Sequence, residues 1–155
     1  MSGIHAHTGV VLARRGLFEA ATKALFGEHV DVVEGFRWPF VENDWFALTD
    51  VDSQIDTVTI GPRAQLKERI TISVSVGSWL PGNEPDTEVA VFDRAFELLA
   101  KVQEQVRLET TLGGAVLWCQ PASAVSAGAT TSDDSGEGRL VEIAATFVCE
   151  HRIKG

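Results

Sequence analysis

A seven-residue segment with strict alternation constrains the fold more than any other part of the chain. From Ile70 to Val76, large apolar residues at even positions alternate with Thr71, Ser73 and Ser75 at odd positions. A period of two is typical of a β-strand with one buried face and one more polar face. Two prolines, a glycine and an asparagine within 78–85 predict that a turn ends this strand.

A helical period replaces the alternation after this turn. Asp86 is predicted to cap the helix at its N-terminus, and Gly113-Gly114 is predicted to follow its end. Residues 115–119 then favour another strand, so the centre of the chain is predicted to be strand, helix, strand. Apolar residues recur at steps of three and four and predict one buried stripe: Val89, Phe92, Ala95, Phe96, Leu99, Val102 and Val106.

The N-terminal third is predicted to add a helix and more strands. A helix is expected from Thr8, as its cap, to about Phe26, followed by a strand over 29–36. Two further strands are expected over 45–51 and 55–60. Residues 50–53, Asp-Val-Asp-Ser, would form the turn between them.

The C-terminal part predicts a long antiparallel hairpin formed by 115–122 and 140–152. Residues 123–138 are rich in Ala, Ser, Thr, Gly and Asp and are expected to form a mobile loop at its end. Residues 1–7 carry no pattern and are expected to be a loose N-terminus. The 155 residues suggest a single domain. The fold class is therefore predicted to be α+β, with a mixed, mostly antiparallel sheet, two helices packed on one face and a long C-terminal β-hairpin.

The charge of the chain excludes two kinds of partner. With 13 basic and 22 acidic residues, the net charge is −9. The surface as a whole is therefore not suited to bind nucleic acid or an anionic membrane, both of which require clustered Lys and Arg. Acidic residues gather between Asp31 and Asp56, which solubility alone would also explain.

The sequence predicts no membrane span and no secretory signal. Cys119 and Cys149 both fall in predicted strands. Buried free thiols are therefore expected, with a cross-strand disulfide or redox pair as the alternative.

We find no motif for catalysis, for a cofactor or for a metal. The four histidines form no metal-binding spacing, and neither a phosphate loop nor a nucleophile elbow is present. The adjacent Asp133 and Asp134 lack an environment that would separate their pKa values. The chain is therefore expected not to be an enzyme and to carry no cofactor.

Aromatic residues in or near predicted turns remain to be explained. They indicate either local packing or contact with another subunit or partner, because interface cores are rich in aromatic side chains. The candidates are Trp38, Phe40, Trp45, Phe46 and Trp79.

Taken together, the order and spacing of several motifs resemble one family over nearly the whole chain. These motifs are Ala13-Arg14-Arg15-Gly16-Leu17, Gly35-Phe36-Arg37-Trp38-Pro39, Trp45-Phe46-Ala47-Leu48 with Asp50, Arg94-Ala95-Phe96-Glu97-Leu98-Leu99, and Leu112-Gly113-Gly114-Ala115-Val116-Leu117-Trp118. The chain is similar to the tail terminator proteins of long-tailed bacteriophages, especially those of actinobacterial phages.

The resemblance implies a structural virion protein that forms a ring, usually a hexamer, on the end of the tail tube. Such a ring stops tube growth and joins the tail to a head connector or stopper protein. It lies at the head-proximal end of the tail, is assembled in the host cytoplasm, and lets DNA pass without specific binding. On this hypothesis Asp50, Asp52 and Asp56 face the channel. Some of 140–153 or 45–51 is expected at the subunit boundary by strand addition.

Three other functions remain open. Another neck protein, a head-completion or connector component, would also form acidic rings. A small ligand-binding α+β domain would instead enclose an apolar cavity. An enzyme with an unrecognised site would show shifted pKa values clustered in a cleft.

Overall fold

The computed structural model describes residues 7, 9–35, 41–57, 66–133 and 136–153. The predicted Thr8 cap and most of the predicted loose N-terminus lie outside these residues. Within them the chain is an α+β protein with the following elements in order: α1 (Gly9–Ala24), β1 (Val30–Glu34), β2 (Asp44–Thr57), β3 (Leu66–Pro81), α2 (Pro85–Leu108), β4 (Trp118–Asp133) and β5 (Gly136–Ile153).

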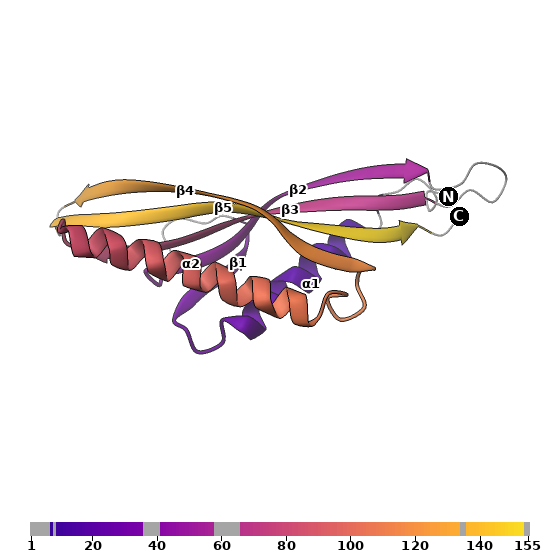
Figure 1. Cartoon of the computed structure of the whole chain (residues 1–155), viewed down its shortest axis with the longest axis horizontal. Coiled ribbons are helices and arrows are strands. Elements are labelled where there is room, and N and C mark those ends of the chain that lie inside the picture. The colour runs from indigo at the N-terminus through magenta and orange to yellow at the C-terminus, as the bar shows by residue number, and fades with distance from the viewer. Residues whose placement is uncertain (1–6, 8, 36–40, 58–65, 134–135, 154–155) are drawn as a thin grey trace.

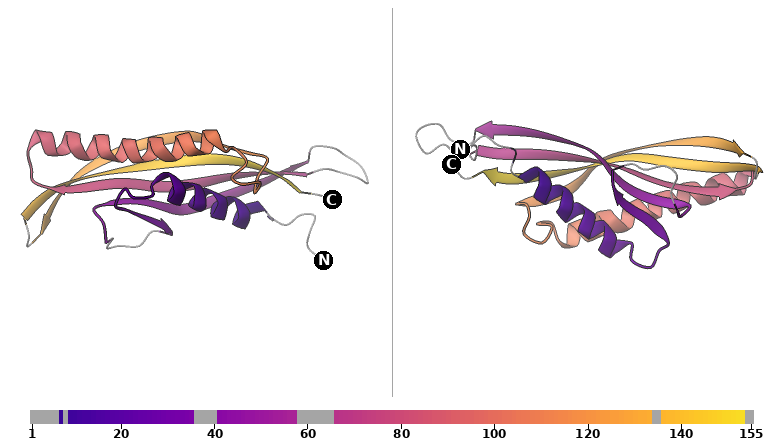
Figure 2. Two further views of the ribbon diagram at one scale, coloured as in Figure 1. Left: turned by 90° about the horizontal axis from the view of Figure 1, so that it is seen from below. Right: turned by 180° about the vertical axis from the view of Figure 1, so that it is seen from behind.

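The strands form one long twisted sheet in the order β1-β2-β3-β5-β4. Only β1 and β2 are parallel, and all other neighbours are antiparallel. Both helices lie on the same face of the sheet, with α2 along the β5 and β4 side and α1 below β1 and β2 (Figures 1 and 2). Neither of the two helices in the described part of the chain lies on the other face of the sheet, which we call the helix-free face. The predicted fold class is confirmed.

The core lies between the sheet and the two helices, and the alternation in β3 is confirmed. Ile70, Ile72, Val74 and Val76 are all buried on the helix side of the sheet. Burying one such side chain contributes about 1.5–3 kcal/mol. The odd positions of β5 and one face of α1 complete this core: Val141, Ile143, Ala145, Phe147 and Cys149, with Ala13, Leu17 and Ala21.

The stripe predicted for α2 is confirmed in its C-terminal half and is wrong in its N-terminal half. Ala95, Leu99, Val102 and Val106 are buried, and Phe96 is partly buried against the core. Val89 and Phe92 are exposed, whereas Val91 and Leu98, which were not in the predicted stripe, are buried. The helix packs over β3 and β5 more than over β4 (Figure 2), and no described residue covers Val89 or Phe92 enough to bury it.

The predicted helix cap is also wrong. Asp86 lies in the first turn of α2, and the N-cap residue is Glu84, whose side chain makes no capping hydrogen bond.

The turn predicted at 50–53 does not exist, and β2 continues through it as one strand. The register with β3 shifts between Leu48 and Val51, so that Thr49 and Asp50 of β2 share the single residue Ser73 of β3. The Thr49 hydroxyl donates a hydrogen bond to the Ser73 carbonyl over 3.1 Å. A bulge absorbs the extra residue here and lets the strand go on.

The loop predicted at 123–138 is also wrong for the described residues. Residues 124–133 pair with 136–145 along the whole hairpin. Most residues of 124–133 have small, uncharged side chains, and they form a strand because the backbone of β5 pairs with them along the whole segment. At the other end of β4, Ala115, Val116 and Leu117 belong to the preceding turn, and the strand begins at Trp118.

The far end of this hairpin is tied to the start of α2. The Gly82 amide donates to the Glu137 carbonyl over 2.8 Å, and the Asn83 side-chain amide donates to the Glu137 carboxylate. Arg139 forms an ion pair with Glu88 of α2, at 3.7 Å. The connection between β3 and α2 therefore holds the hairpin in place.

The two cysteines are free and buried, and they face each other across β4 and β5. Of the two alternatives from the sequence, the structure has the free thiols. A hydrogen bond with the Cys149 thiol, together with burial, raises the pKa of the Cys119 thiol above its ordinary range. The reactive thiolate is therefore suppressed at neutral pH.

We expect neither thiol to react with iodoacetamide in the native protein at pH 8, because burial excludes the reagent and Cys119 stays protonated. Both should react once the protein is unfolded in urea. Intact-mass spectrometry at timed intervals measures the two rates. Alkylation of the native protein at the rate of the unfolded chain would contradict this arrangement.

Candidate interaction surface

The sheet has two unlike edges. β3 lies between β2 and β5 along its length, whereas β4 has a strand on one side only among the described residues. Trp45–Leu48 and Leu140–Glu150 have strands on both sides. Strand addition is therefore excluded at Trp45–Leu48 and Leu140–Glu150, because their backbone groups already pair. Residues 49–51 and 151–153 have a strand on one side at most among the described residues, so a subunit boundary there stays a prediction. Among the described residues, the edges without a further strand are β4 and, at the opposite side, β1 with the second half of β2.

The β4 edge is long and carries few of the devices that usually protect an edge strand. Pro121 and a register shift between Pro121 and Ala124 lie near its start. The following residues 122–132 contain no charged side chain, and 122–130 are exposed. Edge strands are normally protected by Lys, Pro or bulges. The run from 122 to 132 is thus open to further pairing.

The flank of α2 beside this edge is apolar. Val89 is 58% exposed and Phe92 is 44% exposed. The rings of Phe92 and Phe96 have centroids 4.8 Å apart. We call Val89, Phe92 and Phe96 the apolar flank of α2.

The opposite flank of α2 is charged and is bound within the chain. Arg94 contacts Asp44 at 2.9 Å and Glu28 at 3.3 Å, and Lys101 contacts Glu28 at 2.8 Å. Hydrogen bonds from Lys101 and Arg94 hold the pKa of Glu28 below its usual value. These contacts turn the charged flank toward β2 and the turn after α1. The apolar flank therefore faces the other way, toward the β4 edge.

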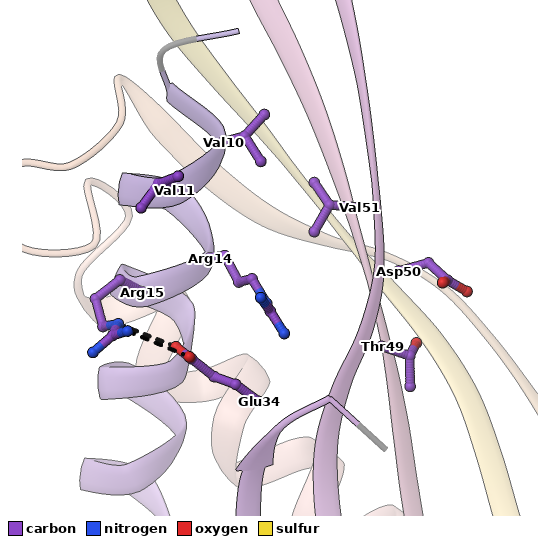
Figure 3. Close-up of a pocket in the computed structure, with 8 residues that line it drawn as sticks. All are labelled: Val10, Val11, Arg14, Arg15, Glu34, Thr49, Asp50 and Val51. Carbon is purple, nitrogen blue, oxygen red and sulfur yellow. Dashed lines mark hydrogen bonds and ion pairs between the residues drawn. The ribbon is translucent and has the colours of Figure 1, made fainter. Parts of the chain in front are cut away.

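A groove lies at the opposite side of the molecule, between α1 and β2 (Figure 3). It has a volume of about 350 Å³. Arg15 and Glu34 form an ion pair across it at 3.1 Å. The Nε atom of Arg14 is buried there and has no hydrogen-bond partner among the described residues. The groove is lined by Val10, Val11, Arg14, Arg15, Glu34, Thr49, Asp50 and Val51.

The predicted channel acids are exposed near or on the helix-free face of the sheet. Asp52 pairs in register with Thr71 and Asp56 with Lys67, both at odd positions of β3, whose side chains lie opposite the buried even positions. Asp50 lies in the bulge and borders a shallow depression of about 620 Å³ on this face. The structure thus brings these acids to one side of the sheet.

The predicted interface aromatics lie in different environments. Trp38 and Phe40 are outside the described residues. Phe46 belongs to the core, and Trp45 is 2% exposed on the helix-free side, where its indole N–H donates to the Ser75 hydroxyl over 3.1 Å. Trp79 is half-buried. Of the three described aromatics, Trp79 alone keeps substantial surface for a partner.

Sequence reasoning missed a buried polar cluster around Glu68, which is fully buried. Its carboxylate accepts hydrogen bonds from the Gly9 amide over 2.7 Å and from the Ser53 hydroxyl over 2.6 Å. His7 and His151 approach the two carboxylate oxygens at 3.5 Å. The Gly9 contact caps the first turn of α1, so this cluster anchors the helix to the sheet.

In the described residues, no group of three or more His, Cys, Asp or Glu side chains is placed to hold a metal ion. The helices of the described part of the chain also lack an apolar run long enough to cross a membrane.

Comparison with known proteins gives a weak likeness to solved structures. No family model matches this chain, and no curated protein matches it. Among solved structures, a chain of the "Virion of native gene transfer agent (GTA) particle" is similar with 14% sequence identity and a TM-score of 0.44. The likeness covers 97% of this chain and 99% of that chain. A TM-score at this level carries no argument about function.

Proposed function

We propose that this protein is a structural protein of a bacteriophage virion that forms a ring on the end of the tail tube. The ring stops tube polymerisation and provides the joint to a head connector or stopper protein. Its role is assembly without bond-making chemistry, and its partners are copies of itself, the tube protein and the connector.

One observation carries the proposal: in the described residues the sheet ends in two different unpaired edges, and both helices lie on the same face. If one edge of a molecule binds the other edge of the next copy, the copies associate head to tail. A suitable rotation between neighbours then closes the row of subunits into a ring. The unprotected β4 edge gives backbone groups for this contact. The motif order that resembles tail terminators supports the same function.

The helix-free face fits the wall of a DNA channel in such a ring. With the helices outside, Asp52 and Asp56 would point inward. Their charge repels phosphate, so DNA would slide past without binding, because binding requires Lys and Arg contacts that release counterions. Asp50 would stand at the same wall.

Negative-stain electron microscopy of the purified protein, alone and with polymerising tube protein, tests the proposal. We expect rings alone and caps on tube ends, with growth arrested in proportion to the protein added. An unrelated acidic protein of similar size serves as the control. A monomer that never binds tube protein would contradict the proposal.

The same microscopy distinguishes the other neck functions. A head-completion or connector component would form rings that bind the portal side and leave tube ends free to grow. Caps on tubes favour the terminator.

A further inference from the structure

We propose that β4 and the apolar flank of α2 bind β1 and the turn after α1 of the next copy of this chain, so that one sheet runs across the subunit boundary. This interface rests on the proposed ring and names the surfaces that would close it.

The acceptor side consists of a free edge and an apolar surface next to it. Gly128 of β4 lies beside Glu88 of α2, since a Cβ built at Gly128 would be 3.5 Å from a Glu88 carboxylate oxygen. The helix side of β4 therefore borders the N-terminal half of α2. A strand added outside β4 would lie over the apolar flank and bury Val89 and Phe92, which this chain leaves exposed.

The polarity of the strands identifies a suitable occupant. β1 runs parallel to β2, and the direction then reverses at each step to β3, β5 and β4. β1 and β4 therefore run in opposite directions. When two copies stand side by side with their helices on the same face, β1 of one meets β4 of the other as an antiparallel pair.

The register across the sheet places the two edges at the same height. Residues that pair from strand to strand form a row across the sheet. The row that starts at Val30 of β1 continues through Asp44, Ser78 and Val141 and ends at Gly128 of β4. The row through Glu34 passes Leu48, Val74 and Ala145 to Ala124. If a second copy lies beside the first with no shift along the strand direction, its residues 30–34 pair with residues 124–128 of the first copy. These residues belong to the uncharged segment 122–132.

The donor side carries an apolar side chain that matches the acceptor. Phe26 lies in the turn between α1 and β1 and is 87% exposed. In the antiparallel arrangement this turn lies on the helix side of the new strand pair, beside the apolar flank of α2. Burial of three aromatic rings at the boundary gives the interface the kind of core that stable contacts use.

Two single variants and their mixture test this interface. Phe92→Glu disables the acceptor and Phe26→Glu disables the donor; each should weaken self-association more than about 30-fold, the loss typical of an interface hot spot. Leu108→Glu is the matched control, because Leu108 is 78% exposed at the end of the same helix. Size-exclusion chromatography with light scattering measures the masses, and circular dichroism checks the fold of each variant.

The mixture separates head-to-tail contact from other modes. Phe92→Glu keeps its donor and Phe26→Glu keeps its acceptor, so the two together should form a dimer although each alone is monomeric. If Phe26→Glu alone still dimerises, β4 pairs with itself and the inference is overturned. If Phe92→Glu still forms rings and caps tubes, the interface is overturned while the proposed function stands. If the wild-type protein neither assembles nor binds tubes, both are overturned.

Discussion

Gly77→Ala is expected to lower the free energy of unfolding by about 2–3 kcal/mol. A Cβ at this position would overlap the indole ring of Trp45, which packs directly across from Gly77 in the register of β2 and β3. Trp45 is buried and bound to Ser75, so the ring has little room to move. Urea denaturation followed by circular dichroism measures the change as a lower midpoint with an unchanged slope.

Gly128→Ala is the matched control for this prediction, because the nearest heavy atom to a Cβ there is at an ordinary 3.5 Å. It should leave the free energy of unfolding unchanged or raise it by about 0.4–1 kcal/mol, because alanine lowers the conformational entropy of the unfolded chain. Trp45→Phe combined with Gly77→Ala should recover part of the loss, since the two residues are coupled. Equal midpoints for Gly77→Ala and Gly128→Ala would show that Trp45 does not pack over Gly77.

Glu68→Ala is expected to cost about 2–3 kcal/mol, the sum of a lost helix cap and a lost hydrogen bond from the partly buried Ser53 hydroxyl to a carboxylate. The carboxylate joins the Gly9 amide of α1 to the Ser53 hydroxyl of β2, so its removal loosens the start of the helix. Urea denaturation gives the stability, and hydrogen exchange of the α1 amides locates the loss.

Glu68→Gln separates hydrogen bonding from charge. The amide oxygen can accept from Gly9 and the amide N–H₂ can donate to Ser53, so we expect this variant to recover most of the stability. Glu104→Ala, at an exposed position of α2, should stay within about 0.5 kcal/mol of the wild type. A Glu68→Ala protein as stable as Glu104→Ala would refute the anchoring role.

The sequence predicted the parts of the fold where one physical signal dominates. The alternation from Ile70 to Val76 and the helical period of 95–106 each arise from burial of one face, and burial decides both structures. The side of the sheet that holds both helices follows from the same pattern.

The errors come from segments whose structure is decided by distant partners. Residues 123–133 have no period and a loop-like composition, and β5 makes them a strand by pairing with them. Residues 50–53 resemble a turn, but the bulge at Thr49 and Asp50 keeps β2 continuous. The intrinsic conformational preference of a short segment does not indicate whether a distant strand will pair with it.

The surface and the anchor were predicted in part. The grouping of Asp50, Asp52 and Asp56 on one side follows from strand alternation only once β2 is known to continue through the predicted turn at 50–53. Glu68 did leave a signal, because extending the alternation of β3 by one step before Ile70 places it on the buried face. The exposure of Phe92 depends on where α2 lies relative to the sheet edge, which no pattern within the helix records.

The tie between the hairpin end and the start of α2 has a mechanical consequence. A pull on residues 136–139 passes through the Glu137 contacts with Gly82 and Asn83 and through the Arg139 pair with Glu88. The end of the β4–β5 hairpin and the start of α2 therefore move together under force. A displacement of the hairpin end is transmitted along the axis of α2 toward the middle of the molecule.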